Sequence, residues 1–226
     1  MASQNGHTDV VRVLLESGAK SQTETRHRTT PLLLAALGGH ADVVKVLLQY
    51  GAETETKTCQ GATPLWMASQ NGYTDIVKIL LQNGAQKESA TCGGATPLFI
   101  ASHGGHAEIV RILLQNGAQK ETKTRGGATP LLFASQNGHT DVVRVLLDNG
   151  ADREAETPGG TTPLLFASHG GHTDVVKVLL EYGAEVEVKT SELGTPLYQA
   201  AENGHSDVVK VLLKRGANKE LSLIHI

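Results

Sequence analysis

Histidine pairs are the feature of this sequence that most directly suggests metal chemistry. His103 and His106 are separated by two glycines, and so are His169 and His172. Two imidazoles can chelate a metal ion weakly, but zinc takes four protein ligands, or three plus water. Neither pair has a Cys, an Asp or a third His placed by spacing to complete the set. We therefore expect no metal site and no cofactor.

Most histidines follow a glycine at one place in a recurring unit. Six of them do so, and Tyr73 stands at the seventh place: His7, His40, His106, His139, His172 and His205. A position that accepts Tyr is not a ligand position. We expect these imidazoles to hydrogen-bond to loop backbone.

Cys59 and Cys92 are the only cysteines and lie 33 residues apart. Two cysteines in a chain of this length form no disulfide framework, which favours a reducing compartment. If the units stack, they are separated by about 10 Å, whereas the Cα atoms of a disulfide lie within about 7 Å. We expect free thiols at the tips of turns.

Glycine pairs such as Gly93-Gly94 and Gly126-Gly127 precede predicted helices, as in a phosphate-binding loop. They lack the preceding strand and the Gly-Lys-Ser/Thr of a P-loop, so we interpret them as turn glycines. Each Ser, His and Asp recurs along the chain, whereas catalysis needs one asymmetric constellation. We predict that the chain is not an enzyme.

Composition excludes two further classes of partner. The net charge is −3 and the sequence pI is about 6.4, so no strong field attracts nucleic acid or anionic lipid. The longest apolar run, Pro31 to Leu37, is far shorter than the ~20 residues needed to cross a bilayer. No signal peptide is visible. We expect no nucleic-acid partner, no membrane insertion, and a location in the cytoplasm or the nucleus.

The elements that must position all these residues repeat with a period of 33. Thr-Pro-Leu begins at Thr30, Thr63, Thr96, Thr129, Thr162 and Thr195. Gly-Ala begins at Gly18, Gly51, Gly84, Gly117, Gly150, Gly183 and Gly216. Markers that share one register establish an internal repeat.

Each period predicts two helices and a turn. Thr129 is a good N-cap and Pro130 suits the first helical position, so a short helix runs from Pro130 to about Gln136. A second helix with a broad apolar face covers about His139 to Asp148. Gly150 then suits the left-handed position that ends many helices. One unit cannot bury its apolar face alone, so the units must stack into a solenoid.

An acid and a base three residues apart recur on the second helix of every unit. This spacing puts both on one helix face, which we interpret as solvated. The pairs are Asp9/Arg12, Asp42/Lys45, Asp75/Lys78, Glu108/Arg111, Asp141/Arg144, Asp174/Lys177 and Asp207/Lys210.

A 33-residue unit with Thr-Pro-Leu and Gly-His resembles the ankyrin repeat, from Ala2 to about Glu220. The resemblance implies an all-α ankyrin-repeat solenoid of stacked helix-turn-helix units with β-hairpin-like fingers. First helices would line a concave groove and second helices the convex back. Ankyrin repeats usually carry His after Thr-Pro-Leu. Apolar or aromatic contacts replace it here, at Leu33, Trp66, Phe99, Leu132, Leu165 and Tyr198.

The repeat register divides the chain into a partial N-terminal repeat (1–24), six consecutive repeats (25–220) and a tail (221–226). The segment from Met1 to Gly6 matches Met67 to Gly72, and no polar capping repeat closes either end. We expect a fragment of a longer array. The tail departs from the pattern and resembles a translated sequencing adapter, so we exclude it.

The sequence thus predicts a monomeric protein–protein interaction scaffold. The alternative is a structural spacer or spring, and a parent enzyme, channel or ubiquitin-system adaptor stays open. Binding residues are expected at finger tips and first-helix ends, because contacts concentrate on loops held by a rigid scaffold. The candidates are Arg26, His27, Gln60, Gln70, His103, Arg125, Gln136, His169, Glu192 and Glu202.

Overall fold

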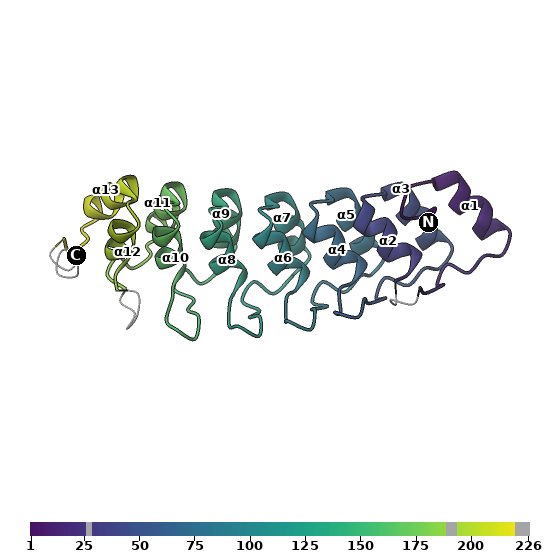
Figure 1. Ribbon diagram of the computed structural model, residues 1–226, viewed down its shortest axis with the longest axis horizontal. Coiled ribbons are helices and arrows are strands. Elements are labelled where there is room, and N and C mark those ends of the chain that lie inside the picture. Colours follow the sequence, from purple (N-terminus) through teal and green to yellow (C-terminus); the bar gives the residue numbers. More distant parts are fainter. Residues whose placement is uncertain (26–28, 189–193, 220–226) are drawn as a thin grey trace. The chain divides into compact units, whose positions relative to one another are not determined.

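The structure is a computed structural model and describes residues 1–25, 29–188 and 194–219. Within this described part, all regular structure is helical, and short and longer helices alternate along the chain (Figure 1). The helices are α1 (Thr8–Glu16), α2 (Pro31–Gly38), α3 (Ala41–Gln49), α4 (Pro64–Gln70), α5 (Thr74–Gln82), α6 (Pro97–His103), α7 (Ala107–Gln115), α8 (Pro130–Gln136), α9 (Thr140–Asp148), α10 (Pro163–His169), α11 (Thr173–Glu181), α12 (Pro196–Glu202) and α13 (Ser206–Lys214). This confirms the predicted all-α class.

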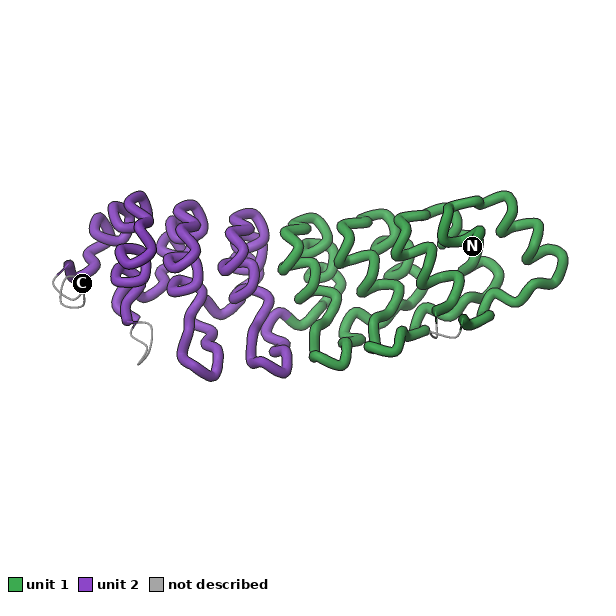
Figure 2. The backbone as a smooth tube through the Cα atoms, in the orientation of Figure 1, with its two compact units in different colours: residues 1–119 green, residues 120–226 purple. Residues whose placement is uncertain are grey.

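The chain divides into two compact units, Met1–Gln119 and Lys120–Ile226 (Figure 2). In the first unit, α2, α4 and α6 pack side by side as one layer, and α1, α3, α5 and α7 form a second layer. In the other unit, α8, α10 and α12 form the first layer, and α9, α11 and α13 form the second. Each unit is therefore a stack of helix pairs, as the repeat register predicts.

The Thr-Pro-Leu motif starts every first helix, and α10 shows how. Thr162 has an extended backbone, and its Oγ1 accepts a hydrogen bond from the amide of Leu165 over 3.4 Å. This bond satisfies one of the amides that a helix start leaves without an intrahelical partner. Pro163 follows at the first helical position, where its missing donor costs nothing. The predicted helix start is confirmed.

Aliphatic side chains fill the core. The second helix α9 buries Val142, Val143 and Leu146 completely. Leu132 and Leu165 are also buried, at the place where ankyrin repeats usually carry His. An apolar contact therefore replaces the usual polar one in these repeats, as expected.

Between repeats, the chain forms narrow turns that resemble hairpins. The amide of Thr58 donates to the carbonyl of Ala62 over 3.0 Å, and the amide of Gly61 donates to the carbonyl of Thr58 over 2.9 Å. Gly61 has φ +84°, a conformation that favours glycine. We call each such turn a finger. In Figure 1 the fingers extend from the side of the first helices.

The acid–base pairs of the second helices are only partly formed. Ion pairs join acid and base at the predicted spacing in four of the seven helices: Asp42–Lys45, Glu108–Arg111, Asp174–Lys177 and Asp207–Lys210. The prediction is wrong for Arg144, which lies 3.6 Å from Glu181 of the next repeat instead. The side chains are long and exposed, so a partner on a neighbouring helix competes with the local one.

Candidate functional site

Four of the Gly-His histidines link their repeat to the one before it. Each ring Nε2–H donates to the main-chain oxygen of the residue 36 positions earlier, at the end of the preceding first-helix segment. The pairs are His40 with Gln4 (2.9 Å), His106 with Gln70 (3.0 Å), His172 with Gln136 (2.8 Å) and His205 with His169 (2.9 Å). We call these contacts the histidine staples. The prediction that the imidazoles bond to backbone is confirmed for these four, and the backbone belongs to the neighbouring repeat.

The staples explain the glycines that surround them. A Cβ on Gly138 would lie 2.6 Å from Nδ1 of His172, and one on Gly170 would lie 2.6 Å from its Nε2. The imidazole therefore fills the space over two glycines from successive repeats. His172 also occupies the N-cap position of α11 and makes no side-chain capping bond there. Its hydrogen-bonding capacity is used between repeats.

A second set of links, which the sequence analysis missed, uses glutamates. Glu55 Oε1 accepts the amide of Gln86 over 2.9 Å, and Oε2 accepts the hydroxyl of Ser89 over 2.7 Å. The same amide contact recurs 31 residues ahead at Glu88, Glu121, Glu154 and Glu187. The 33-residue spacing of these five glutamates was a visible signal. Charge-assisted bonds of this kind hold successive repeats in register.

A groove of about 970 Å³ lies in the first unit, between the first helices and the fingers. Trp66 and Met67 of α4 line it, both half-buried, together with Leu37, which is 45% exposed. The candidates Gln60 and Gln70 also line it, one from a finger and one from the end of α4. We call this set the Trp66 groove. It brings together two of the predicted site residues.

The apolar residues of this groove were not among the predicted ones. In α2, residues Leu32, Leu33, Ala35 and Ala36 are buried, whereas Leu34 is half-buried. The same position holds Met67 and Ile100 in the first unit, and Phe133 and Phe166 in the second, all half-buried. A large apolar residue on the helix face away from the buried positions was the available signal.

In the second unit, the candidates His169 and Glu202 belong to one polar cluster. His169 Nδ1–H donates to Gln199 Oε1 over 2.7 Å. Glu202 accepts hydrogen bonds from the hydroxyl of Tyr198 over 3.1 Å and from the amide of Gln199 over 3.4 Å. The hydrogen bond to Glu202, followed by partial burial and the charge of that carboxylate, raises the pKa of Tyr198 above its ordinary value. Gln199 is only 3% exposed and anchors the cluster.

Two comparisons with known proteins bear on this architecture. The family model for ankyrin repeats in three copies matches residues 1–91, 85–157 and 151–222. The chain belongs to the ankyrin-repeat family. The crystal structure of the human ASB11 ankyrin repeat domain is similar to it, with a TM-score of 0.87 and 31% sequence identity over 96% of both chains. No curated protein sequence matches the chain.

Ankyrin repeats generally mediate protein–protein interactions, and such domains are typically binding modules without enzymatic activity. In the described residues, no three His, Cys, Asp or Glu side chains converge on a point that could hold a metal ion. None of the helices the structure describes is long and apolar enough to cross a membrane.

The remaining candidates lie apart from both sites. Arg125 is exposed at the tip of an ankyrin finger, and Gln136 is exposed at the end of α8. His103 is exposed at the end of α6. Arg26, His27 and Glu192 lie outside the described residues.

Proposed function

We propose that this ankyrin array is a protein–protein interaction scaffold, and that a partner segment binds in the Trp66 groove. The groove carries the proposal because the half-buried Trp66 and Met67 and the exposed Leu37 all line it. Aromatic residues and Met are enriched in the buried centres of protein interfaces. Single exposed apolar residues are common, but a lined groove of such residues indicates a binding surface.

The lining also defines the chemistry of the partner segment. None of the described residues that line the groove is charged. The amides of Gln60 and Gln70 can each donate and accept hydrogen bonds. An extended, uncharged segment fits this surface: its apolar side chains would contact Trp66 and Met67, and its backbone would bond to the two amides.

Binding can be tested with phage-displayed random peptides selected on the reduced protein. Trp66 is the only tryptophan of the chain, so its fluorescence reports occupation of the groove. We expect selected peptides to change this fluorescence, and Met67→Asp to weaken binding roughly tenfold, which corresponds to about 1.4 kcal/mol. Gln82→Asp, on the exposed end of α5, is the matched control and should have no effect. Equal binding to the Met67→Asp variant would place the peptides elsewhere.

The polar cluster of the second unit offers a separate contact surface. A charge change at His169 should weaken partners that bind there, and a charge change at Arg125 should weaken partners that bind at the finger tips. If the chain is instead a structural spacer, neither these changes nor Met67→Asp should alter any interaction, whereas deletion of a whole repeat should change the behaviour of the parent protein. The predicted monomer and the cytoplasmic or nuclear location stay predictions from sequence.

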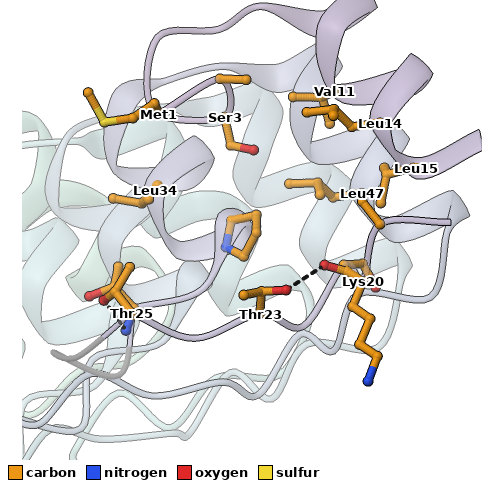
Figure 3. Close-up of a pocket in the computed structure, with 15 residues that line it drawn as sticks. Met1, Ser3, Val11, Leu14, Leu15, Lys20, Thr23, Thr25, Leu34 and Leu47 are labelled. Atoms are coloured by element: carbon orange, nitrogen blue, oxygen red, sulfur yellow. Dashed lines mark hydrogen bonds between the residues drawn. The ribbon is translucent and has the colours of Figure 1, made fainter. Parts of the chain in front are cut away.

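We also propose that the array continues beyond α1. Val10, Val13 and Leu14 are 51%, 59% and 49% exposed. Their counterparts in α9 are almost fully buried: Val142 at 0%, Val145 at 4% and Leu146 at 0%. A cavity of about 270 Å³ opens beside these residues, and Figure 3 shows Val11, Leu15, Leu34 and Leu47 around it.

The residues from Met1 to Gly6 form turns there, whereas their counterparts up to Gln70 are part of α4. A first helix in this place would fill the cavity. Placing a copy of residues 58–66 before Met1 supplies the Thr-Pro-Leu start of such a helix. We expect a higher thermal midpoint, because burial of apolar surface stabilises the array. An unchanged midpoint would contradict the proposal, as would in-frame stop codons just outside both ends of the coding region.

A further inference from the structure

The two cysteines occupy the same place in consecutive fingers. Cys59 follows Thr58 in a turn that the amide of Gly61 closes onto the carbonyl of Thr58 over 2.9 Å. Cys92 follows Thr91 in the next finger, where Gly94 closes the same turn over 2.9 Å. Neither cysteine is part of a disulfide, and both are exposed. They are thus presented at adjacent finger tips, as the sequence predicts.

These two fingers are in direct contact. The amide of Cys92 donates a hydrogen bond to the carbonyl of Gln60 over 2.9 Å. A Cβ added to Gly61 would lie 3.3 Å from Cα of Thr91. Packed helix axes are separated by about 8–10 Å. The two finger tips are therefore in main-chain contact, which the helix spacing alone does not determine.

The contact places the two cysteines in neighbouring positions across the finger tips. Cys59 directly precedes Gln60, and consecutive Cα atoms are about 3.8 Å apart. Cys92 is itself the residue that bonds to Gln60. A disulfide requires Cα atoms within about 7 Å. The hydrogen bond holds Cys92 against the residue next to Cys59, and both turns are exposed, so movement of the turns is what would bring the two Cα atoms into that range.

We propose that Cys59 and Cys92 form a reversible intrachain disulfide by exchange with a small-molecule disulfide such as glutathione disulfide. One protein thiolate attacks a sulfur of glutathione disulfide, so that a mixed disulfide forms and one glutathione thiolate leaves and takes up a proton. The second protein thiolate attacks the protein sulfur of the mixed disulfide and releases the second glutathione. The two cysteines lose two electrons and two protons, and glutathione disulfide is reduced to two glutathione molecules.

The crosslink would close one side of the Trp66 groove. Both cysteines line that groove together with Trp66 and Gln60. A disulfide there fixes the two fingers relative to each other and removes two thiols from the lining. The site thus couples the redox state of the surroundings to the shape of the groove. This inference concerns the finger tips themselves and does not depend on a partner binding there.

The reaction can be followed on the reduced full chain by intact-mass spectrometry, a free-thiol assay and Trp66 fluorescence. With excess glutathione disulfide, we expect the monomer to lose both thiols and the mass of two hydrogens, with no glutathione retained. Trp66 emission should fall, because a disulfide quenches a nearby indole. Across glutathione mixtures at fixed glutathione disulfide, the ratio of oxidised to reduced protein should fall with the square of the reduced glutathione concentration, as an intrachain disulfide requires.

Matched variants separate this outcome from simple thiol exposure. Cys59→Ser should stop at a mixed disulfide on Cys92 that retains one glutathione. Cys92→Ser combined with Gln115→Cys keeps two exposed thiols but moves one to the end of α7, and it should retain two glutathiones. Far-UV circular dichroism should be unchanged in each case. A wild-type chain that retains two glutathiones, or that forms disulfide-linked dimers, would overturn the proposal.

Discussion

Replacement of Gly138 by Ala tests the histidine staples most directly, and Gly150→Ala is its control. The two glycines have nearly the same backbone conformation, with φ +74° and +75°. A Cβ on Gly138 would lie 2.6 Å from Nδ1 of His172, whereas on Gly150 the nearest atom outside its neighbours is Cε of Lys120 at 3.9 Å. Both substitutions impose the same strain, and only one displaces the staple.

The expected magnitudes follow from these contacts. A left-handed backbone costs a non-glycine residue roughly 1–2 kcal/mol, so Gly150→Ala should destabilise the protein by about that amount. Gly138→Ala carries the same cost and must also move the imidazole away from the carbonyl of Gln136, which it contacts over 2.8 Å. Loss of that hydrogen bond adds about 1 kcal/mol. The Gln136 carbonyl sits at an exposed helix end, so water can replace the imidazole there.

Urea unfolding followed by far-UV circular dichroism measures the difference, with His172→Ala and the double variant completing a cycle. In the His172→Ala background, Gly138→Ala should cost no more than Gly150→Ala, which gives a coupling of about 1 kcal/mol. Equal destabilisation by the two single substitutions, or a coupling near zero, would refute the role assigned to the staple. Coincident transitions by fluorescence would justify the two-state treatment.

Three further predictions concern single side chains. Leu146→Ala removes a fully buried side chain of α9 and should cost about 2–5 kcal/mol of unfolding free energy in calorimetry. Thr162→Ala removes the hydroxyl that caps the amide of Leu165 and should lower the free energy of unfolding by about 1 kcal/mol, whereas Thr162→Ser should keep most of the capping stabilisation. Both effects can be measured as shifts of the thermal midpoint. The hydrogen bond and charge of Lys210 lower the pKa of Asp207 below 3.8, so their stabilisation is present above that value and is lost as the pH falls through the depressed pKa. Lys210→Gln should return the pKa of Asp207 toward 3.8 in an NMR titration, and high salt should shift it the same way.

The features that sequence reasoning predicted correctly depend on contacts within one repeat. Thr162 and Pro163 start α10 because an N-cap and a first-turn proline act on amides only a few residues away. Gly150 ends α9 for an equally local reason. Local stereochemistry is readable from spacing, so the helix bounds followed closely from the 33-residue register.

The features that were missed or wrongly predicted depend on which residue of the next repeat a side chain contacts. Glu154 recurs in register with four other glutamates, but its role requires knowing that the amide of Glu185 lies beside it. Arg144 pairs with Glu181 of the next repeat for the same reason. The contact between the fingers of Cys59 and Cys92 also depends on how the turns lean, which helix packing distances do not determine.

The staples separate the groups that hold the array together from the groups available for recognition. His106 and His172 bond to the main-chain oxygens of Gln70 and Gln136, so the bond does not use the side chains at those two positions. His205 bonds in the same way to the oxygen of His169, whose side chain joins the polar cluster instead. Because the end of the first helix contributes only its main-chain oxygen to the staple, that position can carry Gln or His and keep the bond. Positions relieved of packing in this way are where a scaffold can vary its binding surface, and they include most of the helix-end candidates that the sequence indicated.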